Sequence, residues 1–326
     1  MTVIIIVVAA VLGVGSAVLY ALYRVLATAL GGPETAPATL ERRGAPTAAE
    51  PTGPISAEGL VLLFADTFAV PAKAGQQLPQ RRRCLAPLTG DELDARDVAE
   101  KMLFAAFAEL HEEGCIDLVI TASEPTLMPP FPHKNWTLSA RRVREFPRGP
   151  MLDALADAFR EAGGRHRRRG RDPEQPVAVD ELIELAVSRM RRDRSFWERA
   201  GVYADIRAHV ETHLVDQGYL VLSAGDTWLD RFRFRRAVAN EGAAMASEGL
   251  AQELRQRLDR FRQEHASKLP PPEGPGEESI VSGVHRAVTE GAAPLSDLGI
   301  HDGLRVSIAE ALLSLRALEP SDTAGM

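Results

Sequence analysis

The sequence has only two cysteines among its 326 residues, and this scarcity limits the chemistry open to it. Cys84 and Cys115 are far apart, and neither belongs to a Cys-x-x-Cys pair. We therefore expect neither a disulfide framework nor a thiolate metal or redox site. Cys115 lies in an apolar run and is predicted to be a small buried residue. Free thiols of this kind are typical of a cytoplasmic domain.

The sequence also lacks the short motifs of the common enzyme classes. It contains no Gly-x-Ser-x-Gly nucleophile elbow, no phosphate-cradling glycine loop and no dinucleotide-binding fingerprint. His209 and His213 lie four residues apart, but they flank the apolar stripe of a helix and are predicted to be structural. We therefore expect a protein that is not an enzyme and that holds no cofactor and no metal ion.

Lysine is almost absent, with four lysines against 34 arginines. The net charge of −7 hides an uneven distribution, because residues 141–171 hold ten arginines against four acidic residues, whereas residues 264–326 hold ten acidic residues against four basic ones. Anionic lipid headgroups and nucleic acid phosphates both bind such a basic segment. A solvated loop is the alternative. The densest cluster is Arg165, Arg167, Arg168, Arg169 and Arg171.

One long segment carries no charge at all. Val3–Tyr23 is built largely from Val, Ile, Ala and Leu, and at the helical rise it spans about 30 Å, the thickness of the bilayer hydrocarbon core. Residues 1–30 are therefore predicted to form a single transmembrane anchor. A cleavable signal peptide ending near Ala27–Ala29 is the alternative, although no basic residue precedes the run.

The flanking charges predict how this anchor is oriented. No Lys or Arg precedes the span, and three arginines follow it, so the positive-inside rule predicts a cell-membrane protein with a cytoplasmic C-terminal domain. These arginines are Arg24, Arg42 and Arg43.

Small residues recur at every fourth position of the predicted anchor. A ridge of small side chains lets two membrane helices approach closely, so it favours a homo-oligomer. The ordinary composition of membrane helices is the alternative explanation. The ridge consists of Ala9, Gly13, Ala17 and Ala21.

Composition divides the rest of the chain into four parts. Residues 31–57 are rich in Pro and Ala and are predicted to be a tether. Residues 58–268 are long enough for a mainly helical cytoplasmic domain. Residues 269–278 form a Pro/Gly linker, and residues 279–326 are predicted to be a separate, acidic helical segment.

A pattern of helix, glycine and apolar strand occurs twice. The first copy has a helix ending at Gly114 and a strand at 115–120, and the second has a helix ending at Gly218 and a strand at 219–222. A further strand at 228–234 completes a hairpin after the second copy. We predict a mainly α fold with short antiparallel β hairpins in winged-helix-like units, preceded by the transmembrane helix.

Five other segments have helical periodicity. Pro150 suits the first turn of one helix, and Asp180 can cap another. The segments begin at or near residues 150, 180, 250, 280 and 304, and the one at 250 includes Leu250, Leu254, Leu258 and Phe261.

Three blocks between about Ala99 and Phe234 resemble the Golgi phosphoprotein (GPP-type) family. They are Met102–Ile116, with a helix, glycine and strand, Gly149–Leu155, with a Leu-Asp-x-x-Leu helix, and Ile206–Leu220, with a helix ending in Leu-Val-Asp-Gln-Gly. Members of that family are mostly helical peripheral membrane proteins, and the eukaryotic ones bind a phosphoinositide and sort membrane enzymes.

The family's lipid pocket uses two arginines three residues apart. Arg207 falls on the second, whereas Ala204 takes the place of the first. The resemblance therefore implies a module that binds at a membrane surface, without implying phosphoinositide as its ligand.

These observations predict a membrane-anchored, non-enzymatic adaptor that binds anionic lipid headgroups or protein partners. Arg207 and the arginine cluster at 165–171 are its predicted anionic-surface contacts. A membrane-tethered winged-helix DNA-binding regulator is the alternative. Nucleic acid is the less favoured partner, because the helix before the first hairpin, 97–113, has Lys101 against five acidic residues.

Overall fold

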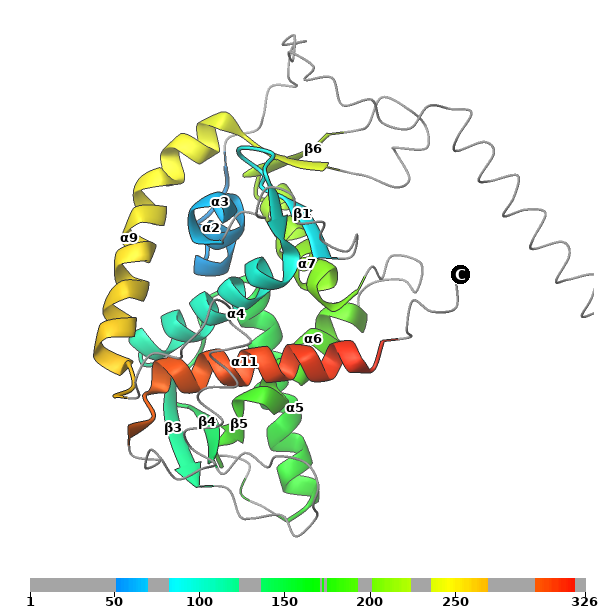
Figure 1. The fold of residues 1–326 in the computed structure, drawn as a ribbon. Helices are drawn as coiled ribbons and strands as arrows, with labels where there is room; N and C mark the ends of the chain where they lie inside the picture. Colours follow the sequence, from blue (N-terminus) through cyan, green and yellow to red (C-terminus); the bar gives the residue numbers. More distant parts are fainter. Residues whose placement is uncertain are drawn as a thin grey trace, which may run out of the picture. The chain divides into compact units, whose positions relative to one another are not determined.

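The computed structural model describes residues 51–69, 82–122, 136–170, 172, 175–192, 201–223, 236–268 and 297–319. Every described residue belongs to one compact unit, Ala48–Met326. This unit is mainly helical and has small antiparallel sheets (Figure 1).

The predicted fold class is wrong in its transmembrane helix. Across the described ranges, no helix has both the length and the apolar composition needed to cross a bilayer. Even α4 (Ala95–Glu112), which is largely buried, carries the charged residues Arg96, Asp97 and Glu100. The predicted anchor at 1–30, with its ridge of Ala9, Gly13, Ala17 and Ala21, lies outside the described residues.

The remaining helices surround α4. They are α2 (Ala57–Leu63), α3 (Ala65–Phe68), α5 (Pro150–Arg168), α6 (Val179–Arg192), α7 (Val202–Asp216), α9 (Glu241–His265) and α11 (Ile300–Ala317).

The strands form three small antiparallel sheets. β1 (Arg83–Leu85) pairs with β2 (Glu92–Asp94), and β6 (Leu220–Ser223) pairs with β7 (Arg236–Ala239). The third sheet has the order β3-β4-β5, with β3 (Ile116–Ala122), β4 (Trp136–Arg142) and β5 (Val177–Ala178). The predicted strand at 228–234 lies outside the described residues, and β6 pairs instead with β7.

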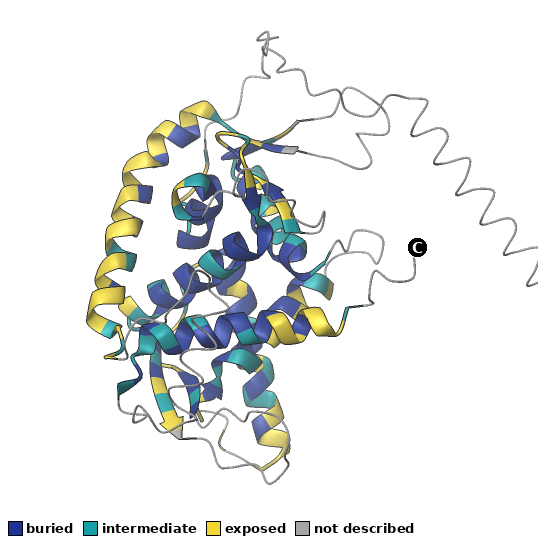
Figure 2. Cartoon of the chain, viewed as in Figure 1, coloured by how far each residue is buried: buried dark blue, intermediate teal, exposed yellow. Residues whose placement is uncertain are grey.

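Helix α4 is the centre of the hydrophobic core. Leu103, Phe107 and Leu110 are fully buried, and α2, α7, α9 and α11 all contact the helix (Figures 1 and 2). Asp94 caps its first turn by accepting a hydrogen bond from the backbone N–H of Arg96 (3.0 Å). In the structure Glu112 is the only exposed residue of α4, whereas a recognition helix must be exposed to enter a DNA groove.

Both predicted glycine caps occur in the structure. Gly114 and Gly218 have φ of 65° and 81°, a backbone conformation that other residues rarely adopt. Each glycine turns the chain from its helix into a strand, because Cys115 N–H bonds to the Leu110 carbonyl (2.7 Å) and Tyr219 N–H bonds to the Leu214 carbonyl (2.8 Å).

The C-terminal segment, predicted to stand apart from the domain, belongs to the same core. Leu304, Ile308 and Leu312 of α11 are buried, and α11 contacts α4, α6 and strands β3 and β4. The approach is close at Gly303, where an added Cβ would lie 3.3 Å from the Ile120 side chain. The apolar stripe of α11 is therefore buried against the rest of the domain.

The end of the predicted tether is attached to α7. Thr52 N–H donates to the Gln217 carbonyl (2.9 Å), and the Tyr219 hydroxyl donates to the Gly53 carbonyl (2.9 Å). Residues 52 and 53 are therefore part of the folded domain, and the tether ends earlier than its Pro/Ala composition suggests.

Helix α9 lies along one side of the domain, and its outward face is exposed (Figure 2). Its N-cap is Asn240, which accepts a hydrogen bond from Gly242 N–H (3.1 Å). Leu250, which we assigned to its apolar face, is 46% exposed. The inward seam has the alternating three- and four-residue spacing of a packed helix and consists of Ala244, Ser247, Ala251, Leu254, Leu258 and Phe261.

We expect Gly299→Ala to lower the free energy of unfolding by about 1–3 kcal/mol. Gly299 is the N-cap of α11, and a Cβ there would overlap the His265 carbonyl oxygen and the backbone of Ala266, so α9 and α11 would have to separate. The matched control is Gly249→Ala in α9, where an added Cβ meets nothing within 4 Å.

The control is expected to stabilise the protein by about 0.5–1 kcal/mol, because alanine is the better helix former. Urea unfolding of the two variants measures both effects. Changes of the same sign in the two variants would contradict the close approach at Gly299.

Candidate anion-binding site

The predicted arginine loop is the end of a helix in the structure. Arg165, Arg167 and Arg168 form the last turn of α5, and Arg169 is its C-cap. Cations are favourable there, because the C-terminal end of a helix carries partial negative charge. Arg171 lies outside the described residues.

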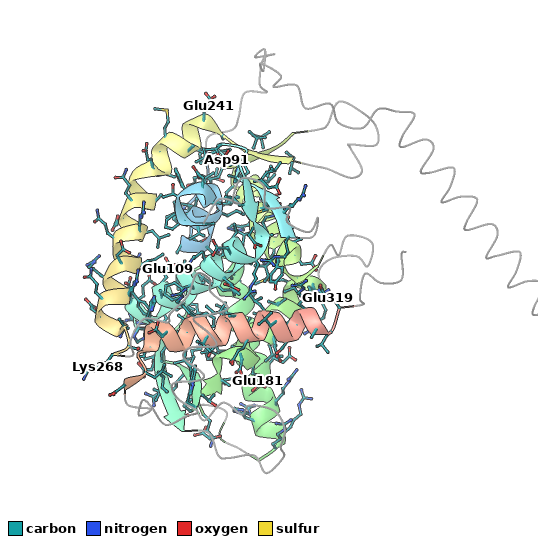
Figure 3. The ribbon with its side chains drawn as sticks, viewed as in Figure 1. Asp91, Glu109, Glu181, Glu241, Lys268 and Glu319 are labelled. Carbon is teal, nitrogen blue, oxygen red and sulfur yellow. The ribbon has the colours of Figure 1, made fainter. Side chains whose placement is uncertain are left out.

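The helix divides the cluster between two sides. Arg165 donates a hydrogen bond to Glu161 (2.8 Å) and lies 3.8 Å from Glu181 of α6, which Figure 3 labels. The hydrogen bond from Arg165 lowers the pKa of Glu161. Arg165 is therefore occupied at the contact between α5 and α6, while Arg167 lies on another side.

Arg167 lines a cavity of about 600 Å³, which we call the arginine pocket. Its walls are the C-terminal half of α5, the segment that follows β4 and the residues that lead into β5. Four arginines line it, and Glu145 is the only carboxylate among the described lining residues. The arginines are Arg142, Arg144, Arg160 and Arg167.

Helical periodicity builds one wall of the pocket. Arg160 and Arg167 are seven residues apart and therefore share a face of α5. Gly163 and Gly164 lie between them on this face and line the pocket as well. An added Cβ at Gly164 meets nothing within 4 Å, so the missing side chain leaves open space between the two arginines.

The facing wall follows from the hairpin. Arg142 is the last residue of β4, and its guanidinium lies over the Phe146 ring, 5.3 Å from the centroid. Its Nε donates to the Arg144 carbonyl (3.2 Å), and Arg144 Nε donates to the Gly114 carbonyl (3.0 Å). Backbone acceptors therefore orient both guanidinium groups.

The pocket has an excess of positive charge. Arg160 forms an ion pair with Asp157, one turn earlier in α5. Arg142, Arg144 and Arg167 form no ion pair with any carboxylate in the part of the chain that the structure describes. Guanidinium groups bind phosphate and carboxylate oxygens through paired hydrogen bonds. The chemistry that this lining offers is the binding of an anion.

The structure does not bring Arg207 to this pocket. Arg207 lies in α7, 3.3 Å from Glu211 and near the buried Cys84, whose thiol has its pKa raised to about 11 by burial. His209 in the same helix lies 3.1 Å from the Pro150 carbonyl, at the opposite end of α5 from Arg167. Arg207 therefore lies near the first turn of α5, whereas Arg167 is in its last turn. Because α5 is about 27 Å long, the two arginines belong to different surfaces.

His209, which we predicted to be structural, lies in α7 and contacts the Pro150 carbonyl at the start of α5. Across the described ranges, no group of three or more His, Cys, Asp or Glu side chains is placed to hold a metal ion.

Sequence reasoning missed three of the four pocket arginines, Arg142, Arg144 and Arg160. All lie in the arginine-rich stretch 141–171, so composition indicated the region. The signal that could have found Arg160 is its seven-residue spacing from Arg167 on one helix, whereas the sequence analysis predicts no strand at β4, so nothing beyond composition pointed to Arg142 and Arg144.

No protein-family model, curated protein or solved structure matches this chain. The resemblance to the Golgi phosphoprotein family therefore stays a prediction.

Proposed function

We propose that this protein is a non-enzymatic binding protein that contacts anionic membrane surfaces through the arginine pocket, with phosphate-bearing lipid headgroups as the ligands. A single observation supports the proposal: among the described residues, four arginines and one carboxylate line the same cavity. Each arginine near an anionic membrane contributes about 1 kcal/mol. The cavity also gives the headgroup phosphate a defined place to bind.

The proposal has consequences for partners and location. A domain that docks at a membrane surface can present its other faces to protein partners, so we propose an adaptor role at the cell membrane. The site needs no cofactor, because binding an anion requires only the oriented guanidinium groups.

Nucleic acid is the competing ligand, since phosphate is common to both. The helix that would enter the groove in a winged-helix complex is α4, and its side chains fill the core. Its one lysine, Lys101, lies 3.9 Å from Asp97. The burial of α4 and the pairing of Lys101 with Asp97 favour lipid over DNA as the source of the phosphate.

The test is flotation of the full chain with phosphatidylcholine vesicles, with and without phosphatidylserine. Arg144→Gln combined with Arg167→Gln is expected to weaken the phosphatidylserine-dependent binding by about 2 kcal/mol, about 1 kcal/mol for each arginine, because neither guanidinium pairs with a carboxylate in the described ranges. The binding should fall as salt rises, because exposed charges are screened beyond about 8 Å at physiological ionic strength.

Two control variants separate the pocket from general charge. Arg165→Gln removes an arginine that already pairs with Glu161. Arg168→Gln with Arg169→Gln removes two exposed charges outside the pocket lining. Both are expected to weaken binding less than the pocket variant does. Equal losses from all three variants, or a site-specific DNA complex that survives competitor DNA, would overturn the proposal.

A further inference from the structure

A second cavity lies on the other side of the domain, where α9 crosses α3, α4 and α11. Its volume is about 340 Å³, and we call it the α9 cavity. Small-molecule sites commonly measure about 300–1,000 Å³. None of the described residues that line it belongs to the arginine pocket.

The inward seam of α9 changes in size along the helix. Its first half has small residues, Ala244, Ser247 and Ala251, and its second half has larger ones, including Leu258 and Phe261. The cavity lies beside this second half, between Arg255 and Arg262.

The Phe261 ring anchors the end of α9 next to the cavity. It packs edge-on against Phe104 of α4, with 5.7 Å between the ring centroids, and lies 6.5 Å from the His301 ring of α11. Phe104 and His301 also line the cavity, so its inner wall is held by the same aromatic contacts that hold the three helices together.

The floor of the α9 cavity is apolar. Phe68, Phe104, Leu258 and Val306 come from four different helices and line it together. Val306 is fully buried, and Phe104 is 9% exposed. A floor of this composition suits a hydrocarbon group, since burying apolar surface is favourable.

The rim is cationic. Arg255 and Arg262 of α9, Arg305 of α11 and Lys101 of α4 line the cavity together with two carboxylates. One of these, Glu100, forms an ion pair with Arg96 in which both side chains are nearly buried (2.6 Å), so its charge is already balanced. The other, Asp259, lies within about one turn of Arg255 and Arg262 in its own helix, while Lys101 lies 3.9 Å from Asp97.

Two rim arginines are placed to share one ligand group. Arg255 and Arg262 are seven residues apart on one face of α9, about 10 Å along its axis. Neither guanidinium forms a side-chain hydrogen bond or ion pair within the described ranges. An anion held between them keeps contact with the apolar floor below.

We propose that the α9 cavity binds an amphipathic anion, a molecule with one anionic head group and an unbranched alkyl chain. The chain lies against Phe104, Leu258 and Val306, and the head group lies between Arg255 and Arg262. Fatty acids and single-chain phospholipids share this chemistry. The inference is independent of the arginine pocket and of its membrane ligand.

Isothermal titration of the full chain with decanoate, decyl phosphate and decanol tests the proposal. We expect both anions to bind about tenfold or more tightly than decanol, because charge-assisted hydrogen bonds hold the head group. Hexanoate should bind more weakly than decanoate, since each buried methylene contributes about fourfold. A preference for decanoate indicates fatty acids as the natural source, and a preference for decyl phosphate indicates single-chain phospholipids.

Charge variants show which residues bind the ligand. Arg255→Gln with Arg262→Gln is expected to reduce decanoate affinity to that of decanol and to leave decanol affinity unchanged. Arg260→Gln, in the same helix but outside the lining, and Arg144→Gln with Arg167→Gln in the arginine pocket are expected to retain decanoate binding.

A cavity-filling variant gives a second test, because Ala309 is buried and lines the cavity. Ala309→Leu is expected to weaken all three decyl ligands together, with circular dichroism as the check that the variant is folded. Equal affinity for decanol and decanoate, or decanoate binding that the double variant of Arg255 and Arg262 leaves intact, would overturn the proposal.

Discussion

Replacing Arg191 with Met is expected to lower the free energy of unfolding by about 2–3 kcal/mol, less than the cost of breaking a fully buried ion pair, because the Arg191 side chain is 24% exposed. Arg191 Nε lies 3.1 Å from Oδ2 of Asp205, a fully buried side chain in the first turn of α7. The variant leaves this carboxylate in the core and removes the guanidinium beside it.

The same arginine also links α6 to the end of α11. Its Nη2 lies 3.2 Å from Glu319, which Figure 3 labels at this end of α11, and Glu319 accepts a hydrogen bond from the backbone N–H of Val202 (2.8 Å). Loss of Arg191 therefore weakens the contact of α6 with both α7 and the end of α11.

The neighbouring residue supplies the matched control. Arg192 is exposed and lies 3.3 Å from the Glu161 carboxylate, so Arg192→Met should change the free energy of unfolding by no more than about 1 kcal/mol. Asp205→Asn combined with Arg191→Met is expected to recover part of the loss, because it removes the buried charge. Urea unfolding measures all three. Similar losses from the two methionine variants would show that the buried pair contributes nothing.

Glu58→Gln is expected to remove a large pH dependence of stability. The Glu58 side chain is fully buried in α2, and its Oε1 accepts a hydrogen bond from Met151 N–H (3.2 Å) at the start of α5. Its Oε2 has no hydrogen-bond partner among the described residues. Burial, together with the charge of Glu109, raises the pKa of Glu58 from 4.5 to about 7.

The sign of the effect follows from where the proton is held. Between pH 4.5 and about 7 the folded protein keeps the Glu58 proton that the unfolded chain has lost. The free energy of unfolding therefore falls as the pH rises through this interval and is constant above it. At about 1.4 kcal/mol per pH unit the total is about 3 kcal/mol.

Glutamine keeps the acceptor for Met151 and cannot ionise. The difference in stability between Glu58→Gln and the wild type should therefore move by about 3 kcal/mol in favour of the variant from pH 4 to pH 8. Urea unfolding at a series of pH values measures it. Burial also raises the pKa of Glu109, so the variant keeps some slope of the same sign. Glu253→Gln, on the exposed face of α9, is the control, and parallel profiles for wild type and Glu58→Gln would contradict the prediction.

The elements that could be predicted from the sequence are those with local signals. Gly114 and Gly218 mark helix ends because only a glycine readily adopts their conformation, and Pro150 begins α5 because its fixed φ suits a first turn. The place of α11 could not be predicted. The proline-rich stretch before it resembles a domain boundary, while the contacts that bury α11 come from elements far away in the sequence, above all α6 and α4.

The same distinction applies to the candidate site. The density of arginine in 141–171 is visible in the sequence, but its division into paired and pocket-lining residues depends on α6 and β4. Arg165 pairs with Glu161 and Glu181, whereas Arg142, at the end of β4, lines the same pocket as Arg167, and the sequence analysis predicts no strand at that position. The transmembrane prediction relied on hydropathy alone, and no described helix takes that role.

The position of α11 has a consequence for how the protein is made in the cell. Trp136 and Ile120 in the small sheet lie against this helix, so a nascent chain that has not yet delivered residues 300–317 exposes part of its core. Exposed apolar surface of this kind attracts chaperones and proteases. Only a chain translated through α11 can therefore bury this part of the core and avoid recognition by chaperones and proteases.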